Sequence, residues 1–442
     1  MIANDIATLF RAFVKTRWGL NFKSRAHLEA YQERHLKVFL AKKLPAFPFY
    51  KKIKVDNLQQ LPIMTKELVL KNFSELNSKN ISLESATRFG LDIESNREFQ
   101  LLLNGITIGL SSGTQGPRGV FLISKKERLV WSGVMLAKAL PPTLLKRMLL
   151  KAKPIKIAFF LRANSRLYST LTAAKRIEFE FYDLLDQWEE LLWKLEVQNP
   201  DVIVAPAKVL SLLASKVEQG TLSIKPNRLI SVAEVLEPDD QALIEKVFQQ
   251  KVHQIYQATE GFLGITCEHN IVHLNEEFIH VEPKWIDNDK TRFLPIVTDF
   301  TRTTQAVVRY QLTDILKIRS EPCPCGSHCM AIEEISGRND DILWMQKPSG
   351  DWKPIFPDII RQGFYASSVP FAFYKVRQKK HIWEIVAGQN SEHQQVEAVR
   401  ICQSIANKQD CILPAINFIP PEDDPIFQKS RRIQCIERPE KQ

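Results

Sequence analysis

A regular alternation of apolar runs and helical stretches in the middle of the chain constrains its fold more than any other feature. Four apolar runs have the length of buried strands: Ile155–Leu161, Val202–Ala205, Arg228–Ala233 and His253–Gln257. The helical stretches between the later runs lie near 186–197, up to Leu213 and over 239–250. Strands that alternate with helices in this way predict a parallel α/β sheet flanked by helices.

The length of 442 residues exceeds what one hydrophobic core usually supports, so we expect two domains. After Gly337–Asp341 the pattern becomes a smaller α+β arrangement, with a hairpin at Phe371–Ala387, a helix at Glu392–Asn407 and a strand at Ile412–Ile419. We therefore predict a large domain over 1–339 and a small domain over 340–442. The first 80 residues should form a mainly helical layer.

A glycine-rich run, Gly109–Gly119, places four of the 16 glycines beside three hydroxyls and Arg118. Backbone N–H groups in such a run can approach a phosphate closely, and hydroxyls and a cation add donors and charge. Apolar stretches on both sides, Leu101–Leu110 and Val120–Ile123, predict flanking strands. The run matches neither the dinucleotide pattern nor the Walker pattern. A solvated turn remains the alternative.

Two later segments carry carboxylates at candidate turns. Tyr256–Gly261 contains Thr259 and Glu260, and a lone carboxylate commonly supplies one Mg²⁺ contact beside phosphates. The alternative is a helix N-terminus capped by Thr259. Farther on, Thr298–Arg302 and Val308–Asp314 end in an aspartate that could accept ribose hydroxyls, or that simply forms a turn.

Composition and charge limit the kinds of binding partner that the protein can have. The net charge of +10 favours anionic ligands, with a local concentration of basic residues over 146–156. The basic residues lack interleaved aromatics, so we expect no nucleic-acid partner. No window approaches 18 apolar residues, and the N-terminal helix with Leu9 and Phe13 should pack on its own domain. We expect a cytoplasmic protein without a membrane span, as a monomer or homodimer.

In this order, the segments resemble motifs of the adenylate-forming (AMP-binding) superfamily, and within it the phenylacetate-CoA ligase branch, which includes deazaflavin-coenzyme adenylating synthetases. Ser111–Pro117 is similar to the motif Ser-Ser-Gly-Thr-Thr-Gly-Lys-Pro, with Gln115 for the second threonine and no lysine before Pro117. Ile230–Glu234 resembles the adenine-side motif of the branch. Gln428–Arg432 resembles the Gly-Lys-x-x-Arg segment, with Gln428 in place of its glycine.

The resemblance implies roles for individual residues. The phosphate loop would hold the β- and γ-phosphates of ATP through Ser111, Ser112, Gly113, Thr114 and Gly116. Ala233, Glu234 and Tyr256 would contact the adenine, and Thr259 would approach the α-phosphate. Glu260 would bind Mg²⁺, Asp314 the ribose, and Arg338 would lie beside it. Asp340 would be the hinge of a small C-terminal lid, and Lys429 the catalytic lysine, acting together with Thr114 and Glu260.

The resemblance also gives the cysteines a role, because some members of the branch carry a structural zinc. Cys267, His273, Cys323 and Cys325 supply three thiolates and one imidazole, a normal tetrahedral zinc set. Cys329 or His328 could compete as the fourth ligand, and unliganded thiols remain the alternative. The other cysteines, Cys402, Cys411 and Cys435, fit small core positions.

The implied activity is ATP-dependent activation of an acyl or aryl carboxylic acid to its adenylate, followed by transfer to a thiol such as CoA. Two alternatives remain: an adenylyltransferase that leaves AMP on its acceptor, and a nucleotide-binding protein with degenerate catalysis. The missing loop lysine and Gln428 motivate the second alternative.

Overall fold

The computed structural model describes residues 2–111, 118–150, 153–161, 176–371, 373–389, 391–421 and 431–439. They form two compact units. Unit 1 comprises Met1–Lys284, Pro295–Leu312 and Ile318–Glu333, and unit 2 comprises Trp285–Leu294, Thr313–Lys317 and Glu334–Gln442. Since unit 2 takes in two segments that precede residue 334, the chain passes between the units several times.

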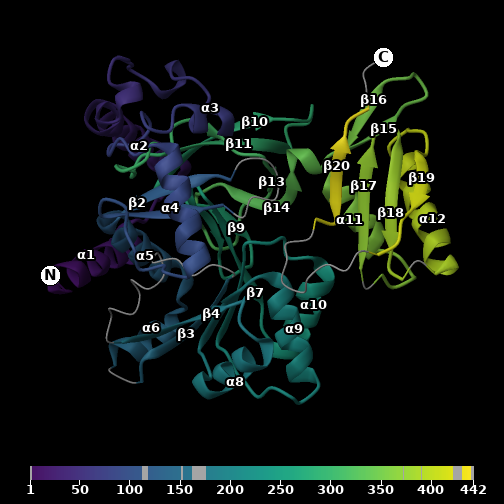
Figure 1. Ribbon diagram of the computed structural model, residues 1–442, viewed down its shortest axis with the longest axis horizontal. Helices are drawn as coiled ribbons and strands as arrows, with labels where there is room; N and C mark the ends of the chain where they lie inside the picture. Colours follow the sequence, from purple (N-terminus) through teal and green to yellow (C-terminus); the bar gives the residue numbers. More distant parts are fainter. Residues whose placement is uncertain are drawn as a thin grey trace. The chain divides into compact units, whose positions relative to one another are not determined.

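Unit 1 is built on the parallel sheet that the alternation predicts (Figure 1). The parallel strands lie in the order β4-β3-β5-β6-β7, and β8 and β9 continue the sheet in antiparallel fashion. Their bounds are β3 Ile155–Leu161, β4 Ile177–Asp183, β5 Val202–Ala205, β6 Arg228–Val232, β7 Val252–Ala258, β8 Gly261–Thr266 and β9 Val272–Leu274. The connecting helices are α8 Trp188–Gln198, α9 Ala207–Glu218 and α10 Pro238–Phe248. The α/β fold prediction is confirmed.

The glycine-rich run connects a two-stranded hairpin, β1 Ile106–Leu110 and β2 Val120–Ser124, whose last register pair is Leu110 with Val120. Helix α4 Leu83–Asn96 packs on this hairpin, and a Cβ on Gly90 would come within 2.8 Å of the Leu110 side chain. The sequence did not predict α4. Its glycine lets the helix approach the strand that leads into the loop.

The N-terminal helix α1 Ile2–Val14 packs on α5 Lys125–Ala139, as expected from its apolar stripe. Leu9 and Phe13 are buried in the core that also contains the strands β3, β5 and β6. At Gly133 the two helices almost touch, since a Cβ there would lie 2.4 Å from the Leu9 carbonyl oxygen. The close approach therefore requires a residue without a side chain.

A smaller core of Tyr31, Phe39, Phe47 and Tyr50 also contains Phe300. The elements around it are α2 Arg25–Val38, α3 Lys66–Lys71, η2 Phe39–Lys43, η3 Leu44–Ala46, η4 Pro48–Tyr50 and η5 Leu58–Gln60. Helix α6 Pro142–Leu149 packs instead in the larger core, and η1 Lys15–Gly19 lies against α1 and α5. The strands that follow β9 are β10 Ile279–Trp285, β11 Arg292–Asp299, β12 Tyr310–Gln311, β13 Asp314–Ile318 and β14 Ala331–Arg338. Among the described residues, no helix is long and apolar enough to cross a membrane.

Unit 2 contains a four-stranded sheet in the order β19-β18-β17-β20. The predicted hairpin is β17 Tyr374–Lys379 with β18 Ile382–Ala387, and the predicted helix is α12 Glu392–Lys408. The predicted last strand is shorter, β19 Ala415–Phe418, and pairs in parallel with β18. The other elements are η7 Asn339–Asp341, β15 Leu343–Gln346, β16 Trp352–Ile355, α11 Pro357–Tyr365 and β20 Ile433–Glu437. Trp383 and Cys402 are fully buried in this core.

The contact at Gly133 is open to a direct test. We expect Gly133→Ala to lower the free energy of unfolding by about 1–3 kcal/mol, because the added methyl group overpacks a backbone contact. Urea denaturation followed by circular dichroism measures this, with Lys126→Ala at an exposed position of the same helix as control. Equal stability of Gly133→Ala and the wild type would contradict the close packing.

Candidate nucleotide site and metal centre

The two ends of the glycine-rich loop are held together by hydrogen bonds. Ser111 N–H donates to the Gly119 carbonyl at 2.8 Å, and Gly119 N–H donates to Ser111 Oγ at 2.7 Å. These bonds extend the β1–β2 hairpin by one residue pair. The loop residues Ser112, Gly113, Thr114, Gln115 and Gly116 lie outside the described part of the chain. Their roles stay predictions.

Arg118 anchors the neck of the loop. Its Nε donates to the Ser111 carbonyl at 2.6 Å, and its two terminal nitrogens donate to both oxygens of Glu94 on α4, at 2.6 and 2.9 Å. The guanidinium of Arg118, which the sequence suggested as a phosphate ligand, is therefore already paired with the Glu94 carboxylate. Glu94 carries no motif signal in the sequence, since a helical glutamate is ordinary.

Thr259 lies directly beside the exit of the loop. A Cβ on Gly119 would lie 3.3 Å from Ser111 Oγ and 3.7 Å from Thr259 Oγ1. Thr259 Oγ1 in turn donates to Glu260 Oε2 at 2.9 Å. Two motifs 140 residues apart in the sequence thus lie next to each other in unit 1.

The interpretation of Thr259 as a helix cap is wrong. Thr259 and Glu260 form the turn between the antiparallel strands β7 and β8, and Gly261 continues it with a φ of +154°. Ala258 pairs with Gly261 across this turn, so β7 continues into an antiparallel hairpin, and the register shifts between Tyr256 and Gln257. Tyr256, the expected adenine neighbour, is 7% exposed in β7.

The end of β6 holds a strained backbone. Ala233 has a φ of +70°, a conformation that a residue with a Cβ adopts rarely and at a cost of about 1–3 kcal/mol. The next residue, Glu234, accepts a hydrogen bond from Lys208 N–H at the start of α9, at 3.4 Å. Because β5, β6 and β7 run in parallel, Ala233 and Thr259 follow strand ends at the same edge of the sheet, where α/β proteins bind ligands.

The remaining candidate residues belong to unit 2. Arg338 Nε lies 3.6 Å from Asp314 Oδ1, so the arginine and the aspartate are neighbours. Arg431 approaches Asp340 at 3.3 Å and Asp341 at 3.2 Å. Burial raises the pKa of Asp341 to about 6, although the charge of Arg431 opposes this shift. Lys429 lies outside the described residues, and the hinge at Asp340 stays a prediction.

Residues 299–305, of which 299–302 stood out in the sequence only as part of a candidate turn segment, hold several of these parts together. Arg302 donates to the Glu260 carbonyl at 2.9 Å, and the Gln305 side chain pairs with the backbone of β2. Glu127, at the start of α5, accepts hydrogen bonds from Thr303 and Thr304 N–H at 2.7 and 3.0 Å. We name residues 299–305 the clasp. The sequence analysis did not single out Glu127, although the capping box that begins at Ser124 is a signal that could have identified it.

The pKa of Glu127 is lowered by the residues of the clasp that surround its carboxylate. Burial raises this pKa, but the hydroxyl of Thr304 and the charge of Arg302 lower it more, to about 2. The carboxylate is therefore stabilised in the folded protein.

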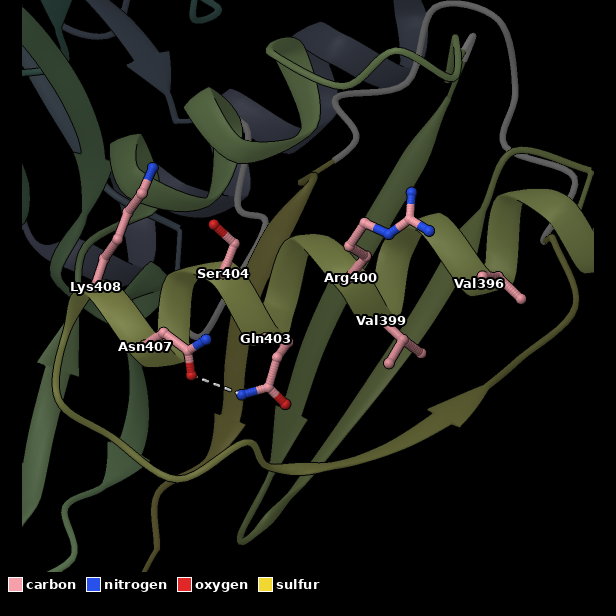
Figure 2. Close-up of a pocket in the computed structure, with 7 residues that line it drawn as sticks. All are labelled: Val396, Val399, Arg400, Gln403, Ser404, Asn407 and Lys408. Atoms are coloured by element: carbon pink, nitrogen blue, oxygen red, sulfur yellow. Dashed lines mark hydrogen bonds between the residues drawn. The ribbon is translucent and has the colours of Figure 1, made fainter.

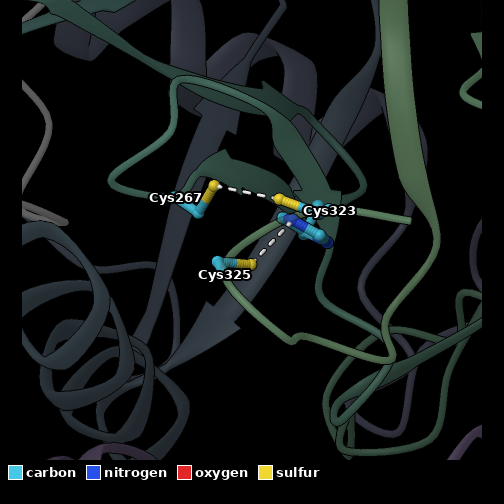
Figure 3. Close-up of side chains that lie close together, drawn as sticks. Cys267, Cys323 and Cys325 are labelled. Atoms are coloured by element: carbon cyan, nitrogen blue, oxygen red, sulfur yellow. Dashed lines mark hydrogen bonds between the residues drawn. The ribbon is translucent and has the colours of Figure 1, made fainter. Parts of the chain in front are cut away.

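The four predicted zinc ligands converge in unit 1 (Figure 3). The Sγ atoms of Cys267 and Cys323 are 3.6 Å apart, and Cys325 Sγ lies 3.4 Å from His273 Nε2. All four ligand atoms lie within 4.8 Å of one another. A zinc tetrahedron has S···S edges of about 3.8 Å and S···N edges of about 3.6 Å, whereas a disulfide requires about 2.05 Å. The spacing fits a metal and excludes a disulfide.

The surroundings also suit a metal. His273 Nδ1 lies 3.0 Å from the Cys329 carbonyl, which fixes the tautomer that presents Nε2 to the cluster. Burial lowers the pKa of His273, so its imidazole is neutral, the form that binds metals. Backbone N–H groups of His269 and Ser327 point at the Sγ atoms of Cys267 and Cys325, both at 3.4 Å.

A separate pocket of about 510 Å³ lies along the outer face of α12 in unit 2 (Figure 2). It is lined by Val396, Val399, Arg400, Gln403, Ser404, Asn407 and Lys408. None of these residues belongs to the motifs described above, so this pocket is not part of the candidate nucleotide site.

Comparisons with known proteins give a fold but no close relative. No family model matches the sequence, and no curated protein matches it. Among solved structures, 2-hydroxyisobutyryl-CoA ligase in the postadenylation state, bound to 2-HIB-AMP, has a TM-score of 0.61 at 14% identity and covers 93% of this chain and 89% of its own. A structure from work on fatty acyl-adenylate ligases from E. coli and L. pneumophila has a TM-score of 0.52 at 12% identity. The match covers 97% of this chain and 96% of that structure's chain.

The chain has the fold of the adenylate-forming enzymes. The open conformation of the 2-hydroxyisobutyryl-CoA ligase, bound to 2-HIB-AMP and CoA, has a TM-score of 0.55. At identities of 12 to 14% these similarities concern the architecture, and the phenylacetate-CoA ligase branch remains a proposal.

The candidate metal centre leads to a prediction about the metal content of the purified protein. Purified protein should contain about one equivalent of zinc, and Cys323→Ser should lose both the metal and stability, because structural zinc contributes to folding. Elemental analysis and thermal unfolding measure these quantities. Cys329→Ala, which removes the thiol of the competing cysteine, should retain the metal. Its loss in Cys329→Ala but not in Cys325→Ser would overturn the ligand assignment.

The depressed pKa of Glu127 predicts acid sensitivity. Its contribution to stability is complete above pH 4.5, the ordinary value, and is lost as the pH falls toward 2. Glu127→Gln should destabilise the protein by up to about 3 kcal/mol at pH 6, and by about 1 kcal/mol less at pH 3.5. Urea titrations at both pH values measure this, with the more exposed Glu218→Gln as control. A difference independent of pH would show that charge is not the cause.

Proposed function

We propose that this chain is an ATP-dependent acid–thiol ligase, which activates a small acyl or aryl carboxylic acid and transfers it to a thiol such as CoA. The observation that carries the proposal is the meeting of Gly119, at the exit of the glycine-rich loop, with Thr259 and Glu260. This proximity supports a single site for the candidate phosphate loop and the candidate Mg²⁺ ligand. The adenylate-forming fold, in which the similar structures bind acyl-adenylates, supports the proposal.

In the first step, a carboxylate oxygen of the acid attacks the α-phosphorus of ATP. The new P–O bond forms as the bond to the β-phosphate oxygen breaks, and pyrophosphate leaves. The loop residues from Ser111 to Gly116 would hold the leaving pyrophosphate, and Lys429 would offset charge at the attacked phosphorus. Mg²⁺ held by Glu260 would neutralise phosphate charge. Positioning supplies the rest of the rate acceleration.

The nucleoside would lie at the carboxyl edge of β5–β7. Ala233, Glu234 and Tyr256 are the proposed adenine neighbours, and Asp314 the proposed ribose ligand with Arg338 beside it. The left-handed Ala233 supports this placement, since backbone strain is concentrated at functional sites.

In the second step, the thiol sulfur attacks the acyl carbon and AMP leaves, while the thiol proton passes to solvent. We propose that the C-terminal domain, 340–442, turns about Asp340 between the two steps. The zinc at Cys267, His273, Cys323 and Cys325 would be structural. We further propose a cytoplasmic enzyme, a monomer or a homodimer.

ATP–pyrophosphate exchange across a panel of aromatic and fatty acids tests the first step. Exchange should depend on one class of acid, and Lys429→Ala should lower it by about 10²–10³-fold, the usual cost of removing one charge-stabilising donor. Lys408→Ala, at an exposed lysine of the same unit, is the control and should leave exchange unchanged.

Product analysis separates the possible outcomes. A thioester with AMP supports the ligase, whereas a stable adenylylated product supports an adenylyltransferase. Absence of exchange with every acid, in protein shown to be folded, would contradict adenylation.

A further inference from the structure

Arg302 is buried where three separate parts of unit 1 meet. Its side chain is 8% exposed, and its guanidinium faces two backbone carbonyls and one carboxylate. One terminal nitrogen donates to the Glu260 carbonyl at 2.9 Å, and the other to the Leu122 carbonyl of β2 at 3.4 Å. Its Nε lies 3.4 Å from Asp299 Oδ2. A single planar group thus contacts both the Glu260 turn and the strand that leaves the phosphate loop.

The carboxylate partner of Arg302 is itself fixed. Asp299 is 8% exposed, and its Oδ1 accepts from the backbone N–H and the hydroxyl of Thr301, at 2.8 and 2.5 Å. A Cβ on Gly261 would lie 3.8 Å from Asp299 Oδ2, so the turn of Glu260 and Gly261 packs next to this carboxylate. Asp299 therefore orients Arg302 toward the turn.

The clasp is also fixed to β2, independently of Arg302. The Gln305 side chain accepts from Leu122 N–H at 2.8 Å and donates to the Val120 carbonyl at 3.2 Å, as a neighbouring strand would. Glu127 holds Thr303 and Thr304 at the start of α5. The position of Arg302 relative to β2 is thus set by its neighbours, and what Arg302 adds is the bond to the Glu260 turn.

We infer that Arg302 is a positioning residue, which holds the turn of Glu260, the proposed Mg²⁺ ligand, at a fixed distance from β2 and Gly119, where the chain leaves the phosphate loop. This inference rests on the proposed function, because it assumes that Glu260 and the loop bind the same Mg²⁺·ATP. The Glu260 carbonyl is held by a charged donor in a buried place, where such a hydrogen bond is strong. Without it, the backbone that carries the Glu260 side chain is no longer held, while Gln305 still holds β2.

The inference predicts a selective defect. In Arg302→Gln, the Mg²⁺ concentration for half-maximal exchange and the KM for ATP should rise about tenfold, while the KM for the acid changes less than twofold. Arg302→Lys retains the charge but cannot reach three partners in a planar fork, so it should recover only part of the loss. If Arg302 had only a structural role, Arg302→Gln would lower stability but leave the Mg²⁺ concentration for half-maximal exchange and the KM for ATP unchanged.

Arg228→Gln is the matched control. Arg228 is equally buried, with a 7% exposed side chain, and pairs with Glu268 at the opposite, amino-terminal end of β6. It should lower the melting temperature to a similar degree without a change in the Mg²⁺ requirement. An equal rise of the Mg²⁺ requirement in both variants would overturn the inference.

A binding measurement separates this inference from the proposed function. The rise in melting temperature caused by Mg²⁺·ATP does not require turnover, and it should need about tenfold more Mg²⁺ in Arg302→Gln than in the wild type. If the wild type binds Mg²⁺·ATP in this way but exchanges no pyrophosphate, the proposed function fails and the positioning role holds. If Arg302→Gln matches the wild type in binding, the positioning role fails. If the wild type shows no Mg²⁺·ATP effect, both fail.

Discussion

The parallel pairing of β5, β6 and β7 is the constraint on which the candidate site depends. Parallel strands bring their carboxyl ends to one edge, so the residues that follow them meet there regardless of their distance in the sequence. Ala233 and Thr259 are placed by this rule alone. The β1–β2 hairpin brings Gly119, where the chain leaves the glycine-rich loop, next to Thr259. A sheet in a different order would leave the same motifs far apart.

Buried polar groups then hold the Glu260 turn and the β1–β2 hairpin in place. A buried charge is costly unless it is paired and hydrogen-bonded, so a buried arginine must have partners in defined directions. Arg302 finds them in Asp299, the Glu260 turn and β2. Glu127 meets the same requirement through Thr303, Thr304 and Ser124. These networks restrict the turn and the hairpin to one relative arrangement, which apolar packing would specify less sharply.

The sequence predicted the features that depend on local pattern. The strand–helix alternation, the strands that flank the glycine-rich run and the C-terminal hairpin and helix are local. The spacings of Cys267 with His273 and of Cys323 with Cys325 are local as well. Their joining into one cluster came from the family resemblance. The sequence could not reveal the ion pair of Arg118 with Glu94, or the bond of Arg302 to Glu260, because each joins distant segments through residue types that are common on any surface. The left-handed backbone conformation of Ala233 could not be predicted for a different reason, since alanine, unlike glycine or asparagine, has no preference for it.

The candidate metal centre and the candidate nucleotide site share one strand, β8, which begins after Glu260 and ends just before Cys267. A metal bound by Cys267, His273, Cys323 and Cys325 would join the β8–β9 hairpin to the segment that leads into β14, where Ala331 pairs with His273. On the other side of this cluster, Glu276 receives Met330 N–H and binds Arg25 of α2, so the segment after Cys325 is also held by the N-terminal helices. With one end of β8 held by the cluster and the other by Arg302, the strand has little freedom to shift in register. A six-residue strand fixed at both ends is a stiff support for a carboxylate that must stay aligned with a phosphate loop.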